Sequence, residues 1–284
     1  MNPKPPAVSV VMRSFNEAWT IGDTIRQLFA QDFAGDIELI VIDSGSSDGS
    51  LEIIQAAKPA KFIQIPLGSY VPGVVLNQGA RAASHEWLIY LNADATPVGA
   101  TWLSELLAPC LANARFGAAF SRQIPRSDCQ AVFAHDYDRC FGPNRESDKW
   151  GHFFSMVSSV THREVLEKHP IREDLQYAED DEWTRRLAQH GFAILYAPDS
   201  VVMHSHNYSL RQAYKRAFGD AKAMAAAGTL EGRAGVLAGW CADAWRDAKW
   251  CQRHHRLGGL PQALGVRLAQ RLGRRDGARH GRQV

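Results

Sequence analysis

Apolar and polar positions alternate along the first third of the chain in a pattern that predicts strands separated by helices. Four short apolar runs have the length and β-branched content of buried strands, at 7–12, 37–42, 61–65 and 87–91. Between them, apolar residues recur at helical spacing over about 17–31, 49–57 and 74–84. Strands joined by helices pair in parallel through right-handed crossovers, so we expect a mainly parallel central sheet.

The pattern beyond Pro97 is less regular and then becomes helical. It predicts a helix at about 100–112, an apolar run at 117–121, an irregular stretch to Lys149, a strand at 153–160, a helix at 179–190, and strands at 192–196 and 200–204. From about residue 207 onward every apolar repeat is helical. We therefore expect an α/β catalytic domain over 1–206 and a helical extension over 207–284.

Composition is that of an ordinary globular protein. The 284 residues are 45% hydrophobic and 22% charged, which is enough for a full core. The apolar runs are too short to cross a bilayer, and Met1 to Ala7 holds prolines and Lys4 in place of a signal-peptide core, so we expect a cytoplasmic protein. Five cysteines without a CxxC pair argue against a disulfide framework and a zinc site.

The net charge of +2 hides an asymmetry. From Arg246 to Val284 there are ten Lys or Arg against Asp247 and Asp276, so this tail carries +8 and the rest of the chain −6. Basic segments suit anionic lipid headgroups or nucleic acid, and a solvated basic face is the common alternative. In the tail, Trp240, Trp245 and Trp250 recur every five residues, and 266–275 mixes apolar and basic positions at helical spacing.

Polar side chains follow several of the predicted strands. RSFNE ends the first strand, IDSGSSDGS ends the second, and Asn92-Ala93-Asp94 ends the fourth. The carboxyl ends of strands are where open α/β sheets usually hold ligands. Neither GxGxxG nor GxxxxGK[ST] occurs, so the motifs support neither a dinucleotide site nor a P-loop.

An ordered series of segments resembles family-2 glycosyltransferases with the GT-A fold, especially bacterial rhamnosyltransferase-like members. The segments are RSFNE, VIDSGSSDGS, LNQGARAA, YLNADATP, YAEDDEW and VVMHSHNYSL, and the likeness covers about 7 to 210. It implies a nucleotide-sugar donor, a divalent cation, and a single displacement that inverts the anomeric carbon.

The resemblance assigns the metal site to Asp94, with Mg²⁺ or Mn²⁺ as the ion. The family's DxD-type motif has an acid at both ends, whereas this chain has Asn92 at the first, which can bond a ribose hydroxyl but brings no negative charge. Family position favours His204 as a second metal ligand. His206 points to the other side of an extended segment, and the sequence leaves open which of the two histidines binds.

The acidic cluster AEDDEW at 178–183 resembles the family's ED motif. By that resemblance Asp180 is the catalytic base, Glu179 contributes to acceptor binding, and Asp181 is a lesser candidate. Acids at a helix start are also expected from the helix dipole alone. We expect the helix N-terminus to keep the pKa of Asp180 from rising.

The remaining candidates are assigned to the nucleotide-sugar. They are Arg13, Glu17, Asp43, Asn77 and Arg81, with Asp43 suited to accept a hydrogen bond from a pyrimidine N–H and Arg81 to reach the pyrophosphate. Acceptor contacts are expected within 122–149.

Two other classes fit part of the sequence. A sugar-phosphate nucleotidyltransferase would need a glycine-rich basic loop near residue 10, where RSFNE stands, and a non-catalytic nucleotide- or lipid-binding module would leave the strand-end acids unexplained.

We expect dTDP-rhamnose as donor, then UDP-hexoses, and a glycan or lipid-linked acceptor. The tail is expected either at an anionic membrane surface or packed on the domain or a second subunit. Nucleic acid is not an expected partner, and the sequence leaves the oligomeric state open.

Overall fold

The structure is a computed structural model that describes residues 6–150, 152–230 and 235–282. The first five residues, part of the segment in which no signal-peptide core is predicted, lie outside this range. The described chain forms two compact units. The first takes residues up to Ile124, then Trp150–Leu175 and Glu179–His204, and the second takes Pro125–Lys149, Gln176–Ala178 and Ser205 onward.

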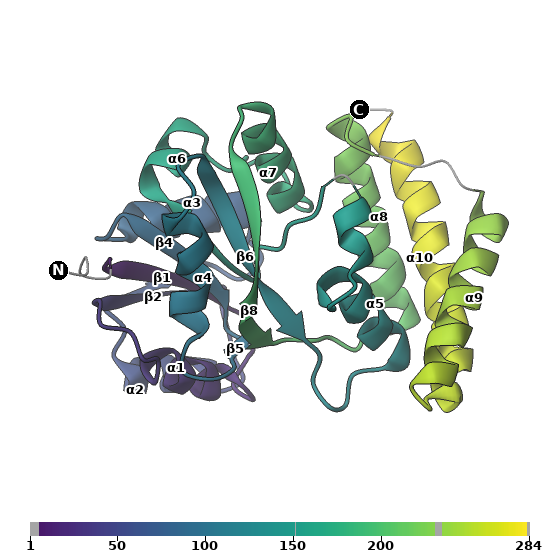
Figure 1. The fold of residues 1–284 in the computed structure, drawn as a ribbon, viewed down its shortest axis with the longest axis horizontal. Helices are drawn as coiled ribbons and strands as arrows, with labels where there is room; N and C mark the ends of the chain where they lie inside the picture. Colours follow the sequence, from purple (N-terminus) through teal and green to yellow (C-terminus); the bar gives the residue numbers. More distant parts are fainter. Residues whose placement is uncertain (1–5, 151, 231–234, 283–284) are drawn as a thin grey trace. The chain divides into compact units, whose positions relative to one another are not determined.

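The first unit is built on one sheet, and its eight described strands lie in the order β3-β2-β1-β4-β7-β6-β8-β5. The strands are β1 (Val8–Ser14), β2 (Ile37–Asp43), β3 (Lys61–Gln64), β4 (Trp87–Asn92), β5 (Thr96–Pro97), β6 (Phe116–Ile124), β7 (Ser158–His162) and β8 (Ala193–Met203). Strands β1 to β4 are parallel to one another, and only β7 and β5 run against their described neighbours. The predicted α/β fold with a mainly parallel sheet is confirmed (Figure 1).

Helices connect these strands and cover the sheet. They are α1 (Ile21–Phe29), α2 (Ser50–Ala57), α3 (Pro72–Ala82), α4 (Trp102–Leu111), α6 (Arg163–Lys168) and α7 (Glu179–Gln189). Alternate residues of β1 face opposite sides, so Met12 meets the α1 side while Val11 lies under Gly79 of α3. A Cβ on Gly79 would come within 2.3 Å of Val11, so this glycine permits the close packing of α3 on the sheet.

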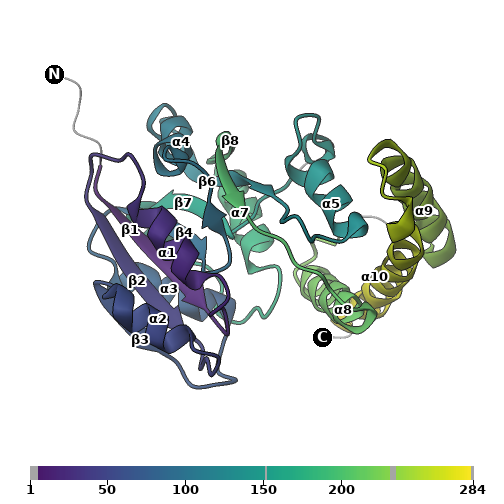
Figure 2. The ribbon, with the colours of Figure 1, turned by 90° about the horizontal axis from the view of Figure 1, so that it is seen from below.

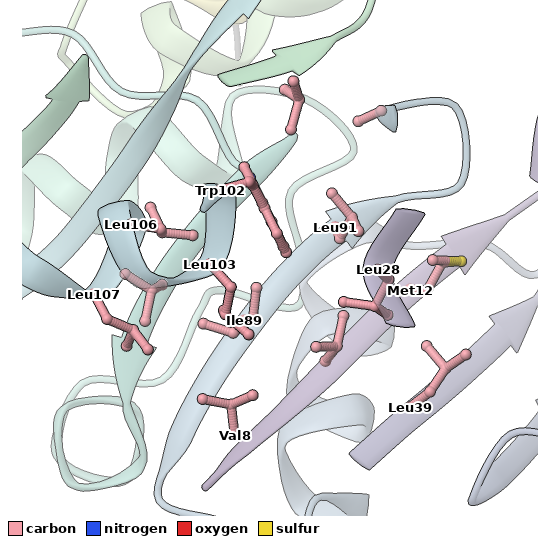
Figure 3. Packing of buried hydrophobic residues seen from close by; sticks show 14 of the residues in the cluster. Val8, Met12, Leu28, Leu39, Ile89, Leu91, Trp102, Leu103, Leu106 and Leu107 are labelled. Atoms are coloured by element: carbon pink, nitrogen blue, oxygen red, sulfur yellow. The ribbon is translucent and has the colours of Figure 1, made fainter. Parts of the chain in front are cut away.

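The main hydrophobic core lies between the sheet and helices α1 and α4. Trp102, Leu103, Leu106 and Leu107 on α4 project toward the strand that carries Ile89 and Leu91 (Figure 3). The Trp102 indole N–H donates to the hydroxyls of Ser121 and Ser158, which satisfies a polar group that is otherwise fully buried. This buried core supports the strands from which the loops of the first unit extend.

Strand register brings the polar strand ends to one edge. Arg13 pairs with Asn92, and Ser14 pairs with Asp43. Immediately after β4, the short strand β5 pairs with the end of β8, where Thr96 faces Met203. This pairing places the residues after β4 beside those after β8.

The structure differs from the sequence pattern in several places. The irregular stretch contains α5 (Ala131–Phe141), the strand predicted at 153–160 begins at Ser158, and the two strands predicted at 192–204 form the single strand β8. Helix α5 was not predicted because His135, Asp136 and Asp138 interrupt its apolar repeat, and in the structure these residues bond other helices.

The second unit is helical. With α5 and η1 (Glu146–Lys149) it contains α8 (Leu210–Ala226), α9 (Val236–Arg253), η2 (Leu257–Gly259) and α10 (Leu260–Gly281). The predicted extension over 207–284 thus shares its core with 125–149, since α5 packs on α9 and α10 (Figure 2). Within the described residues, no helix is long and apolar enough to span a bilayer.

Helices α8 and α10 approach closely along a line of glycines. Gly273, Gly277 and Gly281 recur every fourth residue, and a Cβ at these positions would come within 2.1–2.3 Å of backbone oxygens of α8. Residues four apart share one helix face, so the three glycines form a continuous contact strip.

A buried ion network joins α5, α9 and α10. Asp247 on α9 accepts from Arg267 Nε at 2.8 Å and bonds His135 Nδ1 at 2.6 Å, and Arg267 also donates to both carboxylate oxygens of Asp136. Burial opposes the charge on Asp247, but the bonds from His135 and Arg267 hold the pKa of this carboxyl below its usual value. Part of the basic charge of the tail is therefore internal.

We predict that Gly277→Ala destabilises the protein. Alanine is the better helix former by about 1 kcal/mol, so helix propensity alone would stabilise. Its Cβ would instead lie 2.1 Å from the Phe218 carbonyl oxygen, and forcing α8 away costs roughly 1–3 kcal/mol. Gly258→Ala is the control, because nothing lies within 4 Å of its added Cβ. Thermal unfolding should show a lower Tm for Gly277→Ala only, and a Tm at or above wild type would refute the close contact.

Candidate functional site

Asp94 and His204 meet at the carboxyl edge of the sheet. Asp94 follows β4, His204 follows β8, and Asp94 Oδ2 lies 3.4 Å from His204 Nε2. Both side chains are buried, at 5% and 7% exposure. The β5–β8 pairing is what brings these distant parts of the sequence together.

Gln123 fixes the orientation of the His204 ring. Its amide N–H donates to the Ser155 hydroxyl at 2.7 Å, which turns the amide oxygen toward His204 Nδ1 at 2.9 Å. With Nδ1 donating to that oxygen, Nε2 is the ring nitrogen that faces the Asp94 carboxylate.

This donor set fits a divalent cation. A carboxylate oxygen and an imidazole nitrogen face each other, and an outer hydrogen bond orients the histidine in the manner usual for metal ligands. Asp94 and His204 belong to the first unit, while His206 belongs to the second, where its ring stacks on Tyr208 at 5.3 Å. Within the first unit His204 lies beside Asp94, and the choice between the two histidines as metal ligand stays a prediction.

Asn92 is held by Arg13. The Asn92 Oδ1 atom accepts from Arg13 Nη2 at 2.8 Å and from Nε at 3.2 Å, so its Nδ2 group is oriented as a donor. Arg13 Nη1 also donates to the Tyr70 hydroxyl at 2.9 Å and lies 3.9 Å from Glu179 Oε1. Burial opposes the positive charge of Arg13, but Tyr70 and Glu179 outweigh it, and the pKa of Arg13 is raised.

The loops after β1 and β2 are bonded to each other. Asp43 is fully buried and accepts from the backbone N–H of Gly45 and Ser46 and from the Ser46 hydroxyl. The backbone N–H of Glu17 donates to the Ser50 hydroxyl at 2.8 Å. Asp43 thus shapes its own loop, and its assignment to a pyrimidine N–H stays a prediction.

The start of α7 carries the acidic cluster. Glu179 is buried, and Asp180 is partly buried with backbone N–H groups of Asp181 and Met156 directed at its oxygens, at 2.9 and 3.4 Å. Burial nevertheless raises the pKa of the Asp180 carboxyl, and the neighbouring charge of Asp181 adds to the rise. Our expectation that the helix N-terminus prevents such a rise is wrong, because desolvation exceeds the effect of the backbone donors.

Asn77 and Arg81, two of the residues assigned to the nucleotide-sugar, interact with other residues of the chain. Asn77 is buried, donates to the Ile171 carbonyl oxygen at 2.8 Å and to Glu173 Oε1 at 3.0 Å, and accepts from the Ile171 N–H. Arg81 is exposed and lies 3.6 Å from the same Glu173 carboxylate. Their assignment to the nucleotide-sugar stays a prediction, and a donor would compete with these bonds.

Sequence reasoning missed Tyr70 and Gln123. Gln123 lies in RQIPR, a segment assigned only to acceptor contacts, and Tyr70 lies in a loop without a recognisable motif. The other expected acceptor residues, within HDYDR at 135–139, form bonds inside the second unit. The sequence held one sign of Gln123. Ser121 and Gln123 are two residues apart in β6, so their polar side chains lie on the same face of the strand.

Comparison with known sequences identifies relatives of one kind. The profile described as Glycosyl transferase family 2 matches residues 9–169. The O-antigen chain rhamnosyltransferase RfbN of Salmonella typhimurium is 27% identical over 64% of this chain and 61% of its own length. WbaN of Salmonella anatum, also an O-antigen chain rhamnosyltransferase, is 25% identical over 75% of this chain and 70% of its own. The chain thus spans less than two thirds of RfbN.

Solved structures share the fold. The mannosyltransferase PcManGT of Pyrobaculum calidifontis, in complex with GDP-Man and Mn²⁺, has a TM-score of 0.61 at 19% identity and covers 93% of this chain and 74% of its own. Glucosyl-3-phosphoglycerate synthase of Mycobacterium tuberculosis, in complex with Mn²⁺, UDP and phosphoglyceric acid, has a TM-score of 0.55 at 21% identity over 74% of each chain. At these identities the likeness establishes the GT-A fold alone.

The profile match spans more than half of the chain, and its residues include the strand ends that carry Arg13, Asp43 and Asp94. The chain belongs to glycosyl transferase family 2 and has the GT-A fold.

Proposed function

We propose that this chain is a metal-dependent, inverting rhamnosyltransferase. The donor is dTDP-rhamnose, with UDP-hexoses as the next candidates, and the acceptor is a hydroxyl of a growing cell-surface glycan or of a lipid-linked sugar. The approach of Asp94 to His204 carries the metal part of this proposal. The rhamnosyltransferases RfbN and WbaN, both described as acting on O-antigen chains, support the sugar and the acceptor class.

Asp94 and His204 are the residues that would hold Mg²⁺ or Mn²⁺. The bound ion would neutralise the negative charge that builds up on the departing diphosphate. Asn92 lacks the charge of a second carboxylate, so its part is to donate from Nδ2 to a donor hydroxyl while Arg13 fixes its orientation. His206 stays a candidate for a further ligand by its place in the sequence.

Asp180 is proposed as the general base. It removes the proton from the acceptor hydroxyl, the acceptor oxygen forms a bond to the anomeric carbon, and the bond from that carbon to the diphosphate oxygen breaks with inversion. The raised pKa of Asp180 makes its carboxylate a stronger base than an ordinary aspartate. Glu179 lies beside it and is proposed to bind the acceptor.

The function is tested with a panel of nucleotide-sugars. We expect donor hydrolysis and transfer with dTDP-rhamnose in Mg²⁺ or Mn²⁺, loss of both in EDTA, and recovery when the metal is restored. Asp94→Asn removes a metal ligand and should lose far more activity than Asn92→Ala. Full activity in EDTA would refute the metal site, and equal losses in the two variants would mean that another residue holds the ion.

Asp180→Asn keeps the shape of the side chain and removes its basicity. We expect transfer to fall by roughly 10²-fold or more, while the affinity for donor, measured by calorimetry, stays nearly unchanged. Asp181→Asn is the matched control, because its carboxylate is paired with Arg185 at 2.9 Å, and its loss should be milder. Transfer near the wild-type rate in Asp180→Asn would place the base elsewhere.

The pH dependence of transfer should report on Asp180 and Arg13. The base acts when ionised, so kcat/KM falls as pH drops through its pKa, and burial places this limb above the ordinary aspartate value of about 3.9. The charge of Arg13 lowers the pKa of Asp180, so Arg13→Gln should move the limb to higher pH. Arg26→Gln, on the exposed face of α1, should leave it in place. If the acidic limb of the kcat/KM profile stays at the same pH in Arg13→Gln, the charge of Arg13 does not set the pKa of the base.

A further inference from the structure

Helix α9 of the second unit has an outer face with an unusual order of residues. Leu237, Cys241, Trp245, Lys249 and Arg253 are spaced by four, so they form a continuous row that winds by about 40° at each step with Trp245 at its centre, and all five are exposed. We call this set the α9 ladder. Its first three members are apolar and its last two are basic.

The apolar members of the ladder are large and open to solvent. Leu237 is 72% exposed and Trp245 is 64% exposed. The other two tryptophans of the helix differ, since Trp250 is buried and Trp240 donates its indole N–H to the Leu264 carbonyl oxygen. Of the three regularly spaced tryptophans, Trp245 is therefore the one that faces outward.

The acids of α9 point the other way. Asp243 bonds Arg271 at 2.6 Å and also bonds Arg246, and Asp247 belongs to the buried network described above. Asp138 of α5, which lies near the end of α9, accepts from the Trp250 indole N–H. The negative charges of α9 are thus neutralised inside the unit, and its outer face keeps Lys249 and Arg253.

From this arrangement we propose that the α9 ladder docks on an anionic lipid bilayer surface. The Trp245 ring, with Lys249 Nζ 4.6 Å from its centroid, has an apolar body and a cationic rim, which suits the headgroup level of a bilayer. Leu237 would enter the boundary of the acyl chains, and Lys249 and Arg253 would meet lipid phosphates. The inference does not depend on which donor or acceptor the enzyme uses.

A second copy of this chain fits the ladder less well. Antiparallel two-fold packing of α9 on itself would set Lys249 and Arg253 against Leu237 and Cys241 of the other copy. Those cations would be buried without an acid on the ladder to pair with them, which is costly. Nucleic acid would satisfy the two cations but would leave the apolar half in water.

Vesicle sedimentation of the full-length protein tests the proposal. We expect co-sedimentation with vesicles of phosphatidylcholine containing about one third phosphatidylglycerol, loss of binding at high salt, and little binding to phosphatidylcholine alone. The double variant Trp245→Glu/Lys249→Glu should lower the partition coefficient by about 10-fold or more. Leu111→Glu/Arg115→Glu is the matched control, because it makes the same kind of change four residues apart at exposed positions of the first unit.

Cys241 reports the contact directly because it is the exposed cysteine within the ladder. A polarity-sensitive fluorophore on Cys241 should shift to the blue on addition of the anionic vesicles, and the same fluorophore on Cys241→Ser/Leu111→Cys should not. Donor hydrolysis without vesicles and circular dichroism check that each variant is folded, so failure here is distinct from failure of the proposed reaction.

Three results would overturn the proposal. The first is no binding of the wild-type protein to anionic vesicles at low salt, and the second is an equal loss in the ladder and control variants. The third is a dimer, measured by analytical ultracentrifugation, that dissociates in Trp245→Glu/Lys249→Glu while vesicle binding persists, since the ladder would then be covered by a second copy.

Discussion

The approach of Asp94 to His204 is the contact on which the site depends. It exists because β5 turns back from the end of β4 and pairs with the end of β8, so two strands that are not neighbours in the sheet contribute to one point. Burying a carboxylate and an imidazole is costly unless each is paired, and Gln123 supplies the bond that keeps His204 Nε2 directed at the acid. The parallel strands, packed against α1 and α4, hold this geometry in place.

The other half of the site follows from the substitution of an amide for an acid at residue 92. An aspartate there would place a second negative charge near Asp94, whereas Asn92 accepts from Arg13 and is oriented by it. Arg13 also lies beside Glu179, so one buried cation joins the strand end that carries the donor motif to the helix that carries the proposed base. Arg13 thus links Asn92, proposed to bind the donor, to the helix of the proposed base.

The sequence predicted the sheet well because strands buried on both faces are continuous apolar runs, as in 87–91. It also predicted Asp94 and His204 as neighbours, through resemblance to a family. It did not predict α5, because a buried ion network such as His135 with Asp247 resembles a solvated face when only the sequence is known. For the same reason the sequence did not show that Arg267 is internal. The bonds of Asn77 to the 171–173 segment depend on contacts between distant parts of the chain. The raised pKa of Asp180 depends on the burial of its carboxyl, which only the structure shows.

The central claim is that Asp94 and His204 bind the divalent ion that accompanies the nucleotide diphosphate. Electron paramagnetic resonance of Mn²⁺ titrated into the wild-type protein, with and without dTDP, measures this without relying on turnover. The account predicts Mn²⁺ binding that dTDP strengthens, and loss of that binding in Asp94→Asn/His204→Gln while Leu111→Glu/Arg115→Glu binds as wild type. Equal Mn²⁺ binding in the wild type and in Asp94→Asn/His204→Gln would contradict it.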